Sequence, residues 1–243
     1  MQVNKAKIIL VGPQGKMGRE AVRAINKDPE LTLVATVGRK ERLAEVIACT
    51  DANIMLELTG PHAVFEHTKL AIDKGLSCVV GASGLEKAQI EDLQKRCQEK
   101  QLGGCIIPNF SIASALMSVC SRKIAKYLKE VSIIERHHVA KVDAPSATAK
   151  HTAQQIAKEY TEKRKEDLEC YYEDGVPIHS IRASGVVAQQ EVFFAHPGES
   201  LSIHHTTMER SAFMPGLIMS CRKVLQLRKM VVGLEELMKL SDV

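Results

Sequence analysis

The sequence predicts an α/β protein in which a doubly wound parallel sheet is followed by an α+β region with a mixed sheet. Three observations predict this fold class. Short apolar, β-branched runs alternate with helical segments as far as residue 108, which is typical of a parallel sheet covered by helices on both faces. A glycine-rich turn joins the first run to the first helix. Beyond residue 109 the alternation stops, and strand candidates are separated by loops, as in antiparallel or mixed sheets.

The first unit of this pattern is a strand, a turn, a helix and a second strand. Lys7–Val11 is almost wholly apolar, which predicts a strand buried on both faces. Gly12–Gly18 follows, and Arg19–Ile25 has helical spacing that ends before Pro29, because the residue before a proline is pushed out of the helical region. Leu31–Val37 predicts the second strand, so the unit is a right-handed βαβ motif. The alternation continues with helices over 39–48, 61–74 and 85–100 and strands over 54–59, 77–81 and 105–108.

The second region is predicted from a different order of elements. The expected elements are a helix over 112–128, a strand over 131–135, a polar segment rich in histidine, a helix over 146–159, strands over 178–183, 192–195 and 200–205, and final helices over 215–227 and 235–240. The charged stretch 160–173 is left partly as loop. The strands predict a mainly antiparallel or mixed sheet.

The composition disfavours several classes of protein. A formal net charge of +4 on 243 residues is too small to indicate nucleic-acid binding. No apolar run reaches the ~18 residues of a membrane span, and the apolar stretch before Gly12 is too short for a secretory signal. The seven cysteines include no CxxC pair, which argues against a disulfide framework and a zinc site and predicts a cytoplasmic location.

The turn after the first strand has the features of a phosphate-binding site. Gly12, Gly15 and Gly18 lie between a buried strand and a helix, where glycine permits a tight turn and the close approach of a pyrophosphate. The helix N-terminus adds N–H groups and a partial positive charge. The spacing GxxGxxG departs from the commoner GxGxxG, and an ordinary glycine-rich turn is the alternative. The position of the turn predicts a Rossmann-type dinucleotide site.

The end of the second strand predicts which dinucleotide is preferred. NAD enzymes of this fold place an acidic residue there for the ribose hydroxyls. Here the strand ends in Val37, followed by Gly38, Arg39 and Lys40, with Lys16 in the first turn as a third cation. Cations without a carboxylate favour a 2′-phosphate, so we expect NADPH to be preferred and NADH to remain possible. The alternative is that Arg39 and Lys40 are the solvated start of a helix.

The segment 135–149 carries most of the chemistry in the second region. His137 is a candidate general acid, and Lys141 is a candidate stabiliser of developing negative charge. Ser146 and Thr148 lie at a predicted helix start, where a carboxylate would bind. A structural histidine pair on a loop is the alternative. A metal site is not predicted, because no carboxylate or cysteine stands at ligand spacing.

This segment resembles the E-x-H-H-x-x-K-x-D-A-P-S-G-T-A motif of the bacterial dihydrodipicolinate reductases. The resemblance covers nearly the whole chain. Further motifs occur in the family's order, namely G-x-x-G-x-M-G at 12–18, D-F-T as Glu-Leu-Thr at 57–59, G-T-T-G as Gly-Ala-Ser-Gly at 81–84, N-F-S at 109–111, and a closing pattern with Gly198, Glu199, Arg210 and Phe213.

The resemblance implies an enzyme that reduces 4-hydroxy-tetrahydrodipicolinate (dihydrodipicolinate) to tetrahydrodipicolinate with NAD(P)H, in lysine and diaminopimelate biosynthesis. His137 would be the proton donor and Lys141 the stabilising cation. His138 would help to hold the small dicarboxylate substrate. A clasp of Ser146, Ala147 and Thr148 would bind a substrate carboxylate.

The resemblance also implies cofactor contacts, domains and assembly. The pyrophosphate and adenosine side of the cofactor would be held by Gly12, Gly15, Lys16, Met17 and Gly18. The nicotinamide would be flanked by Gly81, Ala82, Ser83, Asn109, Phe110 and Ser111. Further cofactor contacts would come from Thr59, Arg210 and Phe213. A dinucleotide-binding domain would comprise 1–108 and 214–243. The substrate-binding and oligomerisation domain would comprise 109–213, and its sheets would build a homotetramer.

Three departures from the family pattern leave questions open. Ala147 replaces a glycine, and its N–H serves the carboxylate only if a residue with a methyl group can adopt the backbone angles. Ala82 and Ser83 replace two threonines, and the segment 182–191 differs most, so that its role stays open. The alternatives are an NADP-dependent oxidoreductase acting on another amino-acid-derived acid and a non-catalytic NADP(H)-binding regulator.

Overall fold

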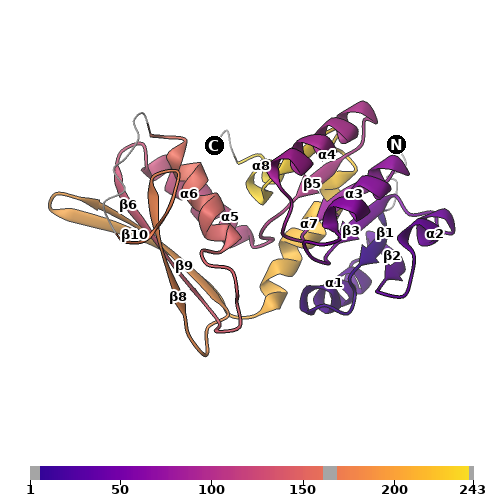
Figure 1. Ribbon diagram of the computed structural model, residues 1–243, viewed down its shortest axis with the longest axis horizontal. Coiled ribbons are helices and arrows are strands. Elements are labelled where there is room, and N and C mark those ends of the chain that lie inside the picture. The colour runs from indigo at the N-terminus through magenta and orange to yellow at the C-terminus, as the bar shows by residue number, and fades with distance from the viewer. Residues whose placement is uncertain (1–5, 161–168, 241–243) are drawn as a thin grey trace. The chain divides into compact units, whose positions relative to one another are not determined.

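A computed structural model describes residues 6–160 and 169–240 (Figure 1). These residues form two compact units. The first combines the residues up to Ser111 with those from Phe213 onward, and the second is Ile112–Ala212. Residues 161–168 of the expected loop lie outside the described part of the chain. Among the helices that the structure describes, none has the length and apolar character to span a membrane.

The first unit is built on a six-stranded parallel sheet in the order β11-β5-β4-β3-β1-β2. Its central strands are buried on both faces, as their apolar runs predict, and helices cover the two faces (Figure 1). The strands are β1 (Ala6–Val11), β2 (Leu31–Val37), β3 (Ile54–Glu57), β4 (Ser77–Val80), β5 (Gly104–Ile106) and β11 (Met230–Val232). The helices are α1 (Lys16–Lys27), α2 (Leu43–Ala48), α3 (Val64–Asp73), α4 (Lys87–Glu99), α7 (Met214–Val224) and α8 (Leu234–Met238).

The strand order of this sheet reverses between β1 and β3. In open α/β sheets ligands bind at the carboxyl ends of the strands beside such a reversal. The residues that follow both strands meet there, since the N–H of Leu58 donates to the carbonyl of Val11 over 3.0 Å. The topology therefore places the glycine turn beside the Glu57–Thr59 motif.

Two local predictions for the first unit are wrong. The helix expected from residue 39 begins at Leu43, because residues 38–42 form a turn in which the carboxylate of Glu41 accepts a hydrogen bond from the N–H of Gly38. The three residues of β11 were not predicted as a strand. Their pairing with β5 adds the sixth strand, and so short a segment has too few residues to show a periodicity.

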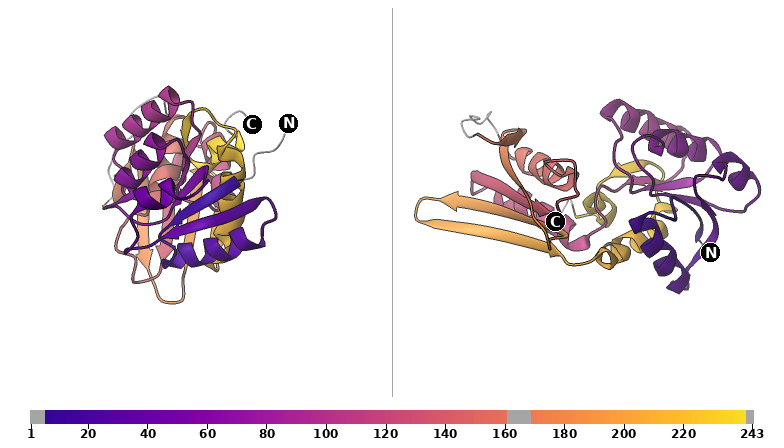
Figure 2. Two further views of the ribbon diagram at one scale, coloured as in Figure 1. Left: turned by 90° about the vertical axis from the view of Figure 1, so that its right-hand side faces the viewer. Right: turned by 60° about the horizontal axis from the view of Figure 1, so that its bottom comes forward.

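The second unit is a five-stranded mixed sheet in the order β10-β9-β6-β8-β7, in which only the pair of β6 and β8 is parallel among the described strands. Its strands are β6 (Glu130–His137), β7 (Tyr171–Glu173), β8 (Val176–Arg182), β9 (Ala188–His196) and β10 (Glu199–Thr207). Helices α5 (Ile112–Ile124) and α6 (Ala147–Ala157) lie on one side of the sheet (Figure 2). Val131, Ile133 and Phe194 point into the core on that side. The fold class predicted from the sequence is therefore confirmed.

The strand β6 is longer than predicted. It continues through Glu135 to His137, so His137 is the last residue of a strand and does not lie on a loop. Side chains alternate between the faces of a strand, so Val131, Ile133, Glu135 and His137 share one face. The prediction ended the strand at Glu135 because a polar segment rich in histidine follows. In the structure Glu135 forms an ion pair with Arg182 of β8.

Candidate active site

The glycine turn of the first unit admits no side chain at two of its positions. Gly12 has a φ of +89°, and a Cβ there would lie 2.9 Å from the carbonyl oxygen of Leu58. A Cβ on Gly18 would lie 2.1 Å from the carbonyl oxygen of Gly12. By contrast, Gly15 has a φ of −66°, and the nearest atom to a Cβ there is 3.5 Å away. Gly12 and Gly18 are thus required by the packing of strand, turn and helix.

The start of α1 suits a bound anion. Gly15 is the N-cap and contributes no capping side chain, and the first turn contains no acidic residue. The first intrahelical bond runs from the N–H of Arg19 to the carbonyl of Gly15 over 3.0 Å, which leaves the N–H groups of Lys16, Met17 and Gly18 without intrahelical acceptors. Lys16 is exposed beside them. These residues fit a dinucleotide pyrophosphate.

The turn after β2 carries a carboxylate that the sequence analysis did not place there. Oε2 of Glu41 accepts from the N–H of Gly38 over 2.7 Å, directly after the last residue of β2. Arg39 and Lys40 are exposed in the same turn and do not begin a helix. The expectation of a strand end without an acidic group is wrong, because a turn of three residues folds Glu41 back onto Gly38.

A buried carboxylate organises the end of β3. Glu57 is fully buried, and its Oε1 accepts hydrogen bonds from the N–H and the hydroxyl of Thr59. Its Oε2 lies 2.9 Å from Nδ1 of His67. The hydrogen bond with Glu57 raises the pKa of His67, and burial opposes that shift. Thr59 is therefore held in place at the carboxyl edge of the sheet.

The expected nicotinamide-side residues gather after β4 and β5. A Cβ on Gly81 would lie 2.5 Å from Cε2 of Phe110, so the ring of Phe110 packs directly against this glycine. The N–H of Ser111 donates to Oδ1 of Asn109 over 2.8 Å. Ala82 is half-buried and Ser83 is exposed in the loop after β4. A short 3₁₀ helix before α7 begins at Arg210 and ends at Phe213. In the described hydrogen bonds, neither residue contacts another predicted site residue.

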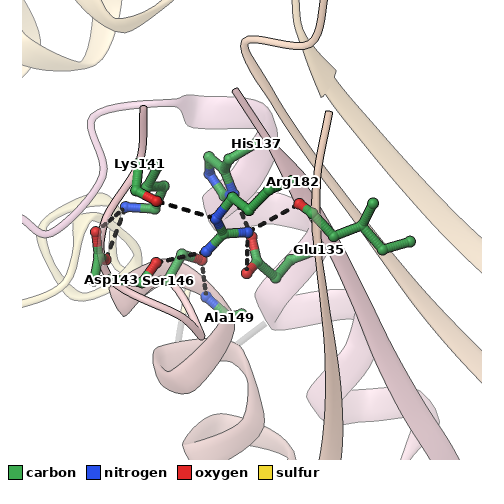
Figure 3. Close-up of polar contacts among 8 residues, drawn as sticks. Glu135, His137, Lys141, Asp143, Ser146, Ala149 and Arg182 are labelled. Carbon is green, nitrogen blue, oxygen red and sulfur yellow. Dashed lines mark hydrogen bonds and ion pairs between the residues drawn. The ribbon is translucent and has the colours of Figure 1, made fainter. Parts of the chain in front are cut away.

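In the second unit, His137 contacts a buried ion pair formed by Glu135 and Arg182 (Figure 3). Nδ1 of His137 bonds to Oε2 of Glu135, whose side chain is fully buried. Oε1 of Glu135 accepts from Nη1 of Arg182 over 2.9 Å. Burial alone would raise the pKa of Glu135, but hydrogen bonds from His137, Ser180 and Arg182 lower it to about 2. Glu135 is therefore ionised at neutral pH, so Nδ1 of His137 is the donor and Nε2 is left for other partners.

The loop after β6 carries the second predicted catalytic group. Nζ of Lys141 donates to both carboxylate oxygens of Asp143, over 2.7 and 2.8 Å. Although burial raises it, the pKa of Asp143 is lowered by the hydrogen bond from Lys141. Lys141 and Asp143 also offer their backbone carbonyls to Arg182. The ammonium of Lys141 is thus held near His137 by a partner that an anionic ligand could replace.

The start of α6 is capped by Ser146. Its hydroxyl accepts from the N–H of Ala149 over 3.2 Å. Ala147 is the first residue of α6 and is not among the described residues with positive φ, so a methyl group is tolerated there. Thr148 follows it, and His138 is half-buried with its carbonyl bonded to the N–H of Lys141 over 3.0 Å. First-turn N–H groups without acidic neighbours can receive a carboxylate.

Sequence reasoning missed two residues of this site, Glu135 and Arg182. The pattern Glu-x-His at 135–137 places both side chains on one face of a strand, and that period of two was the available signal. Arg182 pairs with His137 in the register of β6 and β8, which no local pattern reveals. Within 6–160 and 169–240, no group of three or more potential metal ligands gathers.

Family models and curated relatives match nearly the whole chain. The family model for the N-terminus of dihydrodipicolinate reductase matches residues 6–110, and the model for its C-terminus matches residues 112–238. The 4-hydroxy-tetrahydrodipicolinate reductase of Coxiella burnetii (strain RSA 493 / Nine Mile phase I) is 40% identical over 235 residues, covering 95% of this chain and 98% of the relative. That of Legionella pneumophila (strain Philadelphia 1) is 40% identical over 245 residues, covering 96% and 100%.

A solved structure gives the same result. The dipicolinate-bound dihydrodipicolinate reductase from Paenisporosarcina sp. TG-14 superimposes with a TM-score of 0.82 at 32% identity, covering 96% of this chain and 99% of that one. The resemblance inferred from the motifs is confirmed. Both family models, the relatives and the solved structure agree over nearly the full length, and the chain belongs to the dihydrodipicolinate reductase family.

Proposed function

We propose that this NAD(P)H-dependent oxidoreductase reduces 4-hydroxy-tetrahydrodipicolinate to tetrahydrodipicolinate in lysine and diaminopimelate biosynthesis, with His137 as the general acid. Curated relatives at 40% identity carry this activity in their names. The observation that carries the residue roles is the convergence of His137, Lys141 and the start of α6 around one loop (Figure 3). An imidazole, an ammonium and a helix N-terminus are the groups that a dianionic, hydride-accepting ring requires.

The chemistry assigns a separate task to each group. The bound nicotinamide supplies the hydride. The 4-hydroxyl group leaves as water, which gives the doubly unsaturated ring of dihydrodipicolinate. Hydride addition to that ring leaves an electron pair that must be protonated, and Nε2 of His137 donates that proton because Nδ1 is engaged by Glu135. The ammonium of Lys141 leaves the carboxylate of Asp143, binds the anionic ligand and stabilises the developing charge. The start of α6 with Ser146, Ala147 and Thr148 binds a carboxylate, and His138 helps to orient the ring.

The reaction is tested by following NADPH oxidation with substrate generated in situ by the preceding synthase. We expect turnover that depends on that substrate and is inhibited by pyridine-2,6-dicarboxylate, a planar mimic. Absence of substrate-dependent oxidation would exclude the proposed reaction. Oxidation with an unrelated keto acid or imine acid, but not with this substrate, would favour an oxidoreductase of another substrate class.

Replacing Lys141 by alanine is expected to lower kcat roughly 10²-fold and to weaken binding of the dicarboxylate, because a cation near the developing charge is lost. Steady-state kinetics and titration with pyridine-2,6-dicarboxylate measure both effects. The control is Lys150→Ala, since Nζ of Lys150 lies 4.8 Å from the ring centre of Tyr171 and takes no part in the loop. A change in thermal stability alone would assign Lys141 a structural role.

We also propose that NADPH is preferred over NADH. Glu41 is held by the N–H of Gly38, while Arg39 and Lys40 form no ion pair among the described residues. Two adjacent free cations favour the 2′-phosphate. The double variant Arg39→Ala/Lys40→Ala should raise KM for NADPH about tenfold and leave KM for NADH nearly unchanged, because about 1.4 kcal/mol of phosphate binding is lost. Arg42→Ala, which removes a cation paired with Glu45, is the control. A lower KM for NADH in the wild type would overturn the preference.

We propose that the chain is a cytoplasmic homotetramer assembled through the uncovered face of the five-stranded sheet. In the strand register, Ile134, Ile181 and Phe193 lie on the face opposite α5 and α6. Ile181 and Phe193 are 42% and 37% exposed, and large exposed apolar side chains on one sheet face are typical of subunit contacts.

Replacing Phe193 by glutamate is expected to dissociate the tetramer into smaller species, because a charge would be buried at the contact. Sedimentation or light scattering measures the mass. Leu201→Glu is the matched control, since Leu201 is 41% exposed but pairs with Phe194 on the opposite face of the sheet. A wild-type mass for the Phe193 variant, or equal dissociation of both variants, would exclude assembly through this face.

A further inference from the structure

We propose that Glu135 and Arg182 are positioning residues that hold the imidazole of His137 and the loop of Lys141 in one arrangement. The inference rests on the proposed function, because it concerns the groups assigned to that reaction. Neither residue is assigned a contact with substrate or cofactor. They act through His137 and through the backbone of residues 141–143.

The strand register brings the pair together. Glu135 faces Ser180 and His137 faces Arg182 across the parallel pair of β6 and β8. All four side chains therefore belong to one sheet face, and Arg182 is adjacent to both the histidine and the buried carboxylate. The backbone reinforces this, since the N–H of Ala183 donates to the carbonyl of His137 over 3.0 Å.

Glu135 uses its two oxygens for different partners. Oε2 bonds to Nδ1 of His137, and Oε1 accepts from Nη1 of Arg182 over 2.9 Å. A carboxylate that receives Nδ1–H fixes the orientation and the tautomer of an imidazole and leaves Nε2 directed at the opposite side. Because Glu135 is fully buried, water does not compete for either oxygen.

Arg182 joins this carboxylate to the loop. Its Nε donates to the carbonyl of Lys141 over 3.3 Å, and its Nη2 donates to the carbonyl of Asp143 over 2.5 Å (Figure 3). The guanidinium is planar, and its donors are fixed relative to one another. A shift of the loop would therefore cost hydrogen bonds to the group that also holds Glu135. Lys141 and His137 are in this way kept in fixed relation, although they are four positions apart in the sequence.

The charged groups that the described residues place around His137 come from three elements. Glu135 comes from its own strand, Arg182 from β8, and Lys141 and Asp143 from the loop. The residues opposite Glu135 and His137 on β9 are the uncharged Gln190 and Ala188. Glu135 is thus the carboxylate bonded to the imidazole, and its removal would leave Nδ1 without the acceptor that fixes the tautomer.

The test is the double variant Glu135→Gln/Arg182→Gln, which removes both charges together and leaves no buried charge unpaired. We expect kcat to fall about 10²-fold, because misplacement of a catalytic group by 1 Å has an effect of that order. The ¹⁵N chemical shifts of the His137 ring should no longer report a single Nδ1–H tautomer, because the carboxylate that accepts from Nδ1 is gone. KM for NADPH should remain unchanged.

The matched control is Arg122→Gln/Glu159→Gln. This pair is also half-buried in the second unit, with Nε of Arg122 2.7 Å from Oε1 of Glu159, and it contacts none of the site residues in the described hydrogen bonds. It should alter thermal stability without changing kcat or the tautomer of His137. A wild-type kcat and tautomer in the test variant would overturn the inference, as would equal losses of kcat in the test and control variants.

Two further measurements decide the matter if the double variant does not fold. Arg182→Lys keeps the charge beside Glu135 but cannot reproduce the fork of donors to the loop, so we expect weaker binding of pyridine-2,6-dicarboxylate with an unchanged tautomer of His137. Unchanged binding would overturn the role of Arg182. In the wild type, ¹⁵N chemical shifts of the His137 ring should show protonated Nδ1 across the neutral range, and an Nε2–H tautomer would overturn the role of Glu135. The NMR result stands even if the wild type fails to reduce the dicarboxylate, an outcome that would exclude only the proposed reaction.

Discussion

Replacing His137 by alanine is expected to lower kcat by roughly 10²- to 10⁴-fold, the range typical of the loss of a general acid. The imidazole is the group at the end of β6 whose Nδ1 is bonded to an ionised, buried carboxylate, so its Nε2 is available for proton transfer. Binding of NADPH should be nearly unaffected, because all the expected cofactor residues except Arg210 belong to the first compact unit. Steady-state kinetics and fluorescence titration with NADPH measure the two effects separately.

The control for this experiment lies on the same sheet. His196 is exposed at the last position of β9, where the strand pairs with the beginning of β6 and not with its end. His196→Ala should retain wild-type kcat. His138→Ala should raise KM for the dicarboxylate more than it lowers kcat, in keeping with a substrate-holding role. An unchanged rate for His137→Ala would remove this residue from the proton transfer and would leave the site without its assigned donor.

The second large effect is expected at Gly18. A Cβ there would lie 2.1 Å from the carbonyl oxygen of Gly12 and 2.9 Å from the backbone of Pro13, so Gly18→Ala must move the turn or the helix. We expect a loss of about 1–3 kcal/mol in the free energy of unfolding, the range for overpacking. NADPH binding should be lost as well, because the displaced N–H groups are those that would receive the pyrophosphate. Denaturant unfolding and NADPH titration test the two parts.

Gly15→Ala is the matched variant in the same turn. Its φ of −66° suits any residue, and a Cβ would meet only the carbonyl oxygen of Gly12 at 3.5 Å. Stability should therefore change by less than about 0.5 kcal/mol. NADPH binding should still weaken, because the methyl group would occupy the space where the phosphates approach the backbone. Equal destabilisation by both substitutions would contradict the distinction between a packing glycine and a binding glycine.

Much of the first unit could be predicted because its signals are local. The apolar run Lys7–Val11, the glycines that follow it and the helical spacing after Gly18 all lie within a few turns of chain, and each corresponds to an observed element. The motif with His137, Lys141 and Ser146 could likewise be identified from the sequence, because its residues are close together along the chain.

Other features depended on residues that are distant along the chain. The end of β6 was predicted two residues early because a polar segment rich in histidine follows Glu135, and Arg182, which pairs with Glu135, lies 47 residues away. The strand β11 has three residues and exists only through its pairing with β5, which is far away in the sequence. By contrast, Glu41 is only three positions from Gly38, and the acidic group after β2 was missed because a turn, and not the strand itself, places it there.

The sequence by itself determined the alternation of strands and helices, the glycine turn and the segment that carries the proposed catalytic residues, because periodicity and short motifs act over a few residues. Only the tertiary structure decided which side chains hold the imidazole of His137. The register between β6 and β8 is set by the packing of the whole sheet against α5 and α6, and that register brings Arg182 to Glu135 and His137. A one-residue change of register would send the guanidinium to the opposite face.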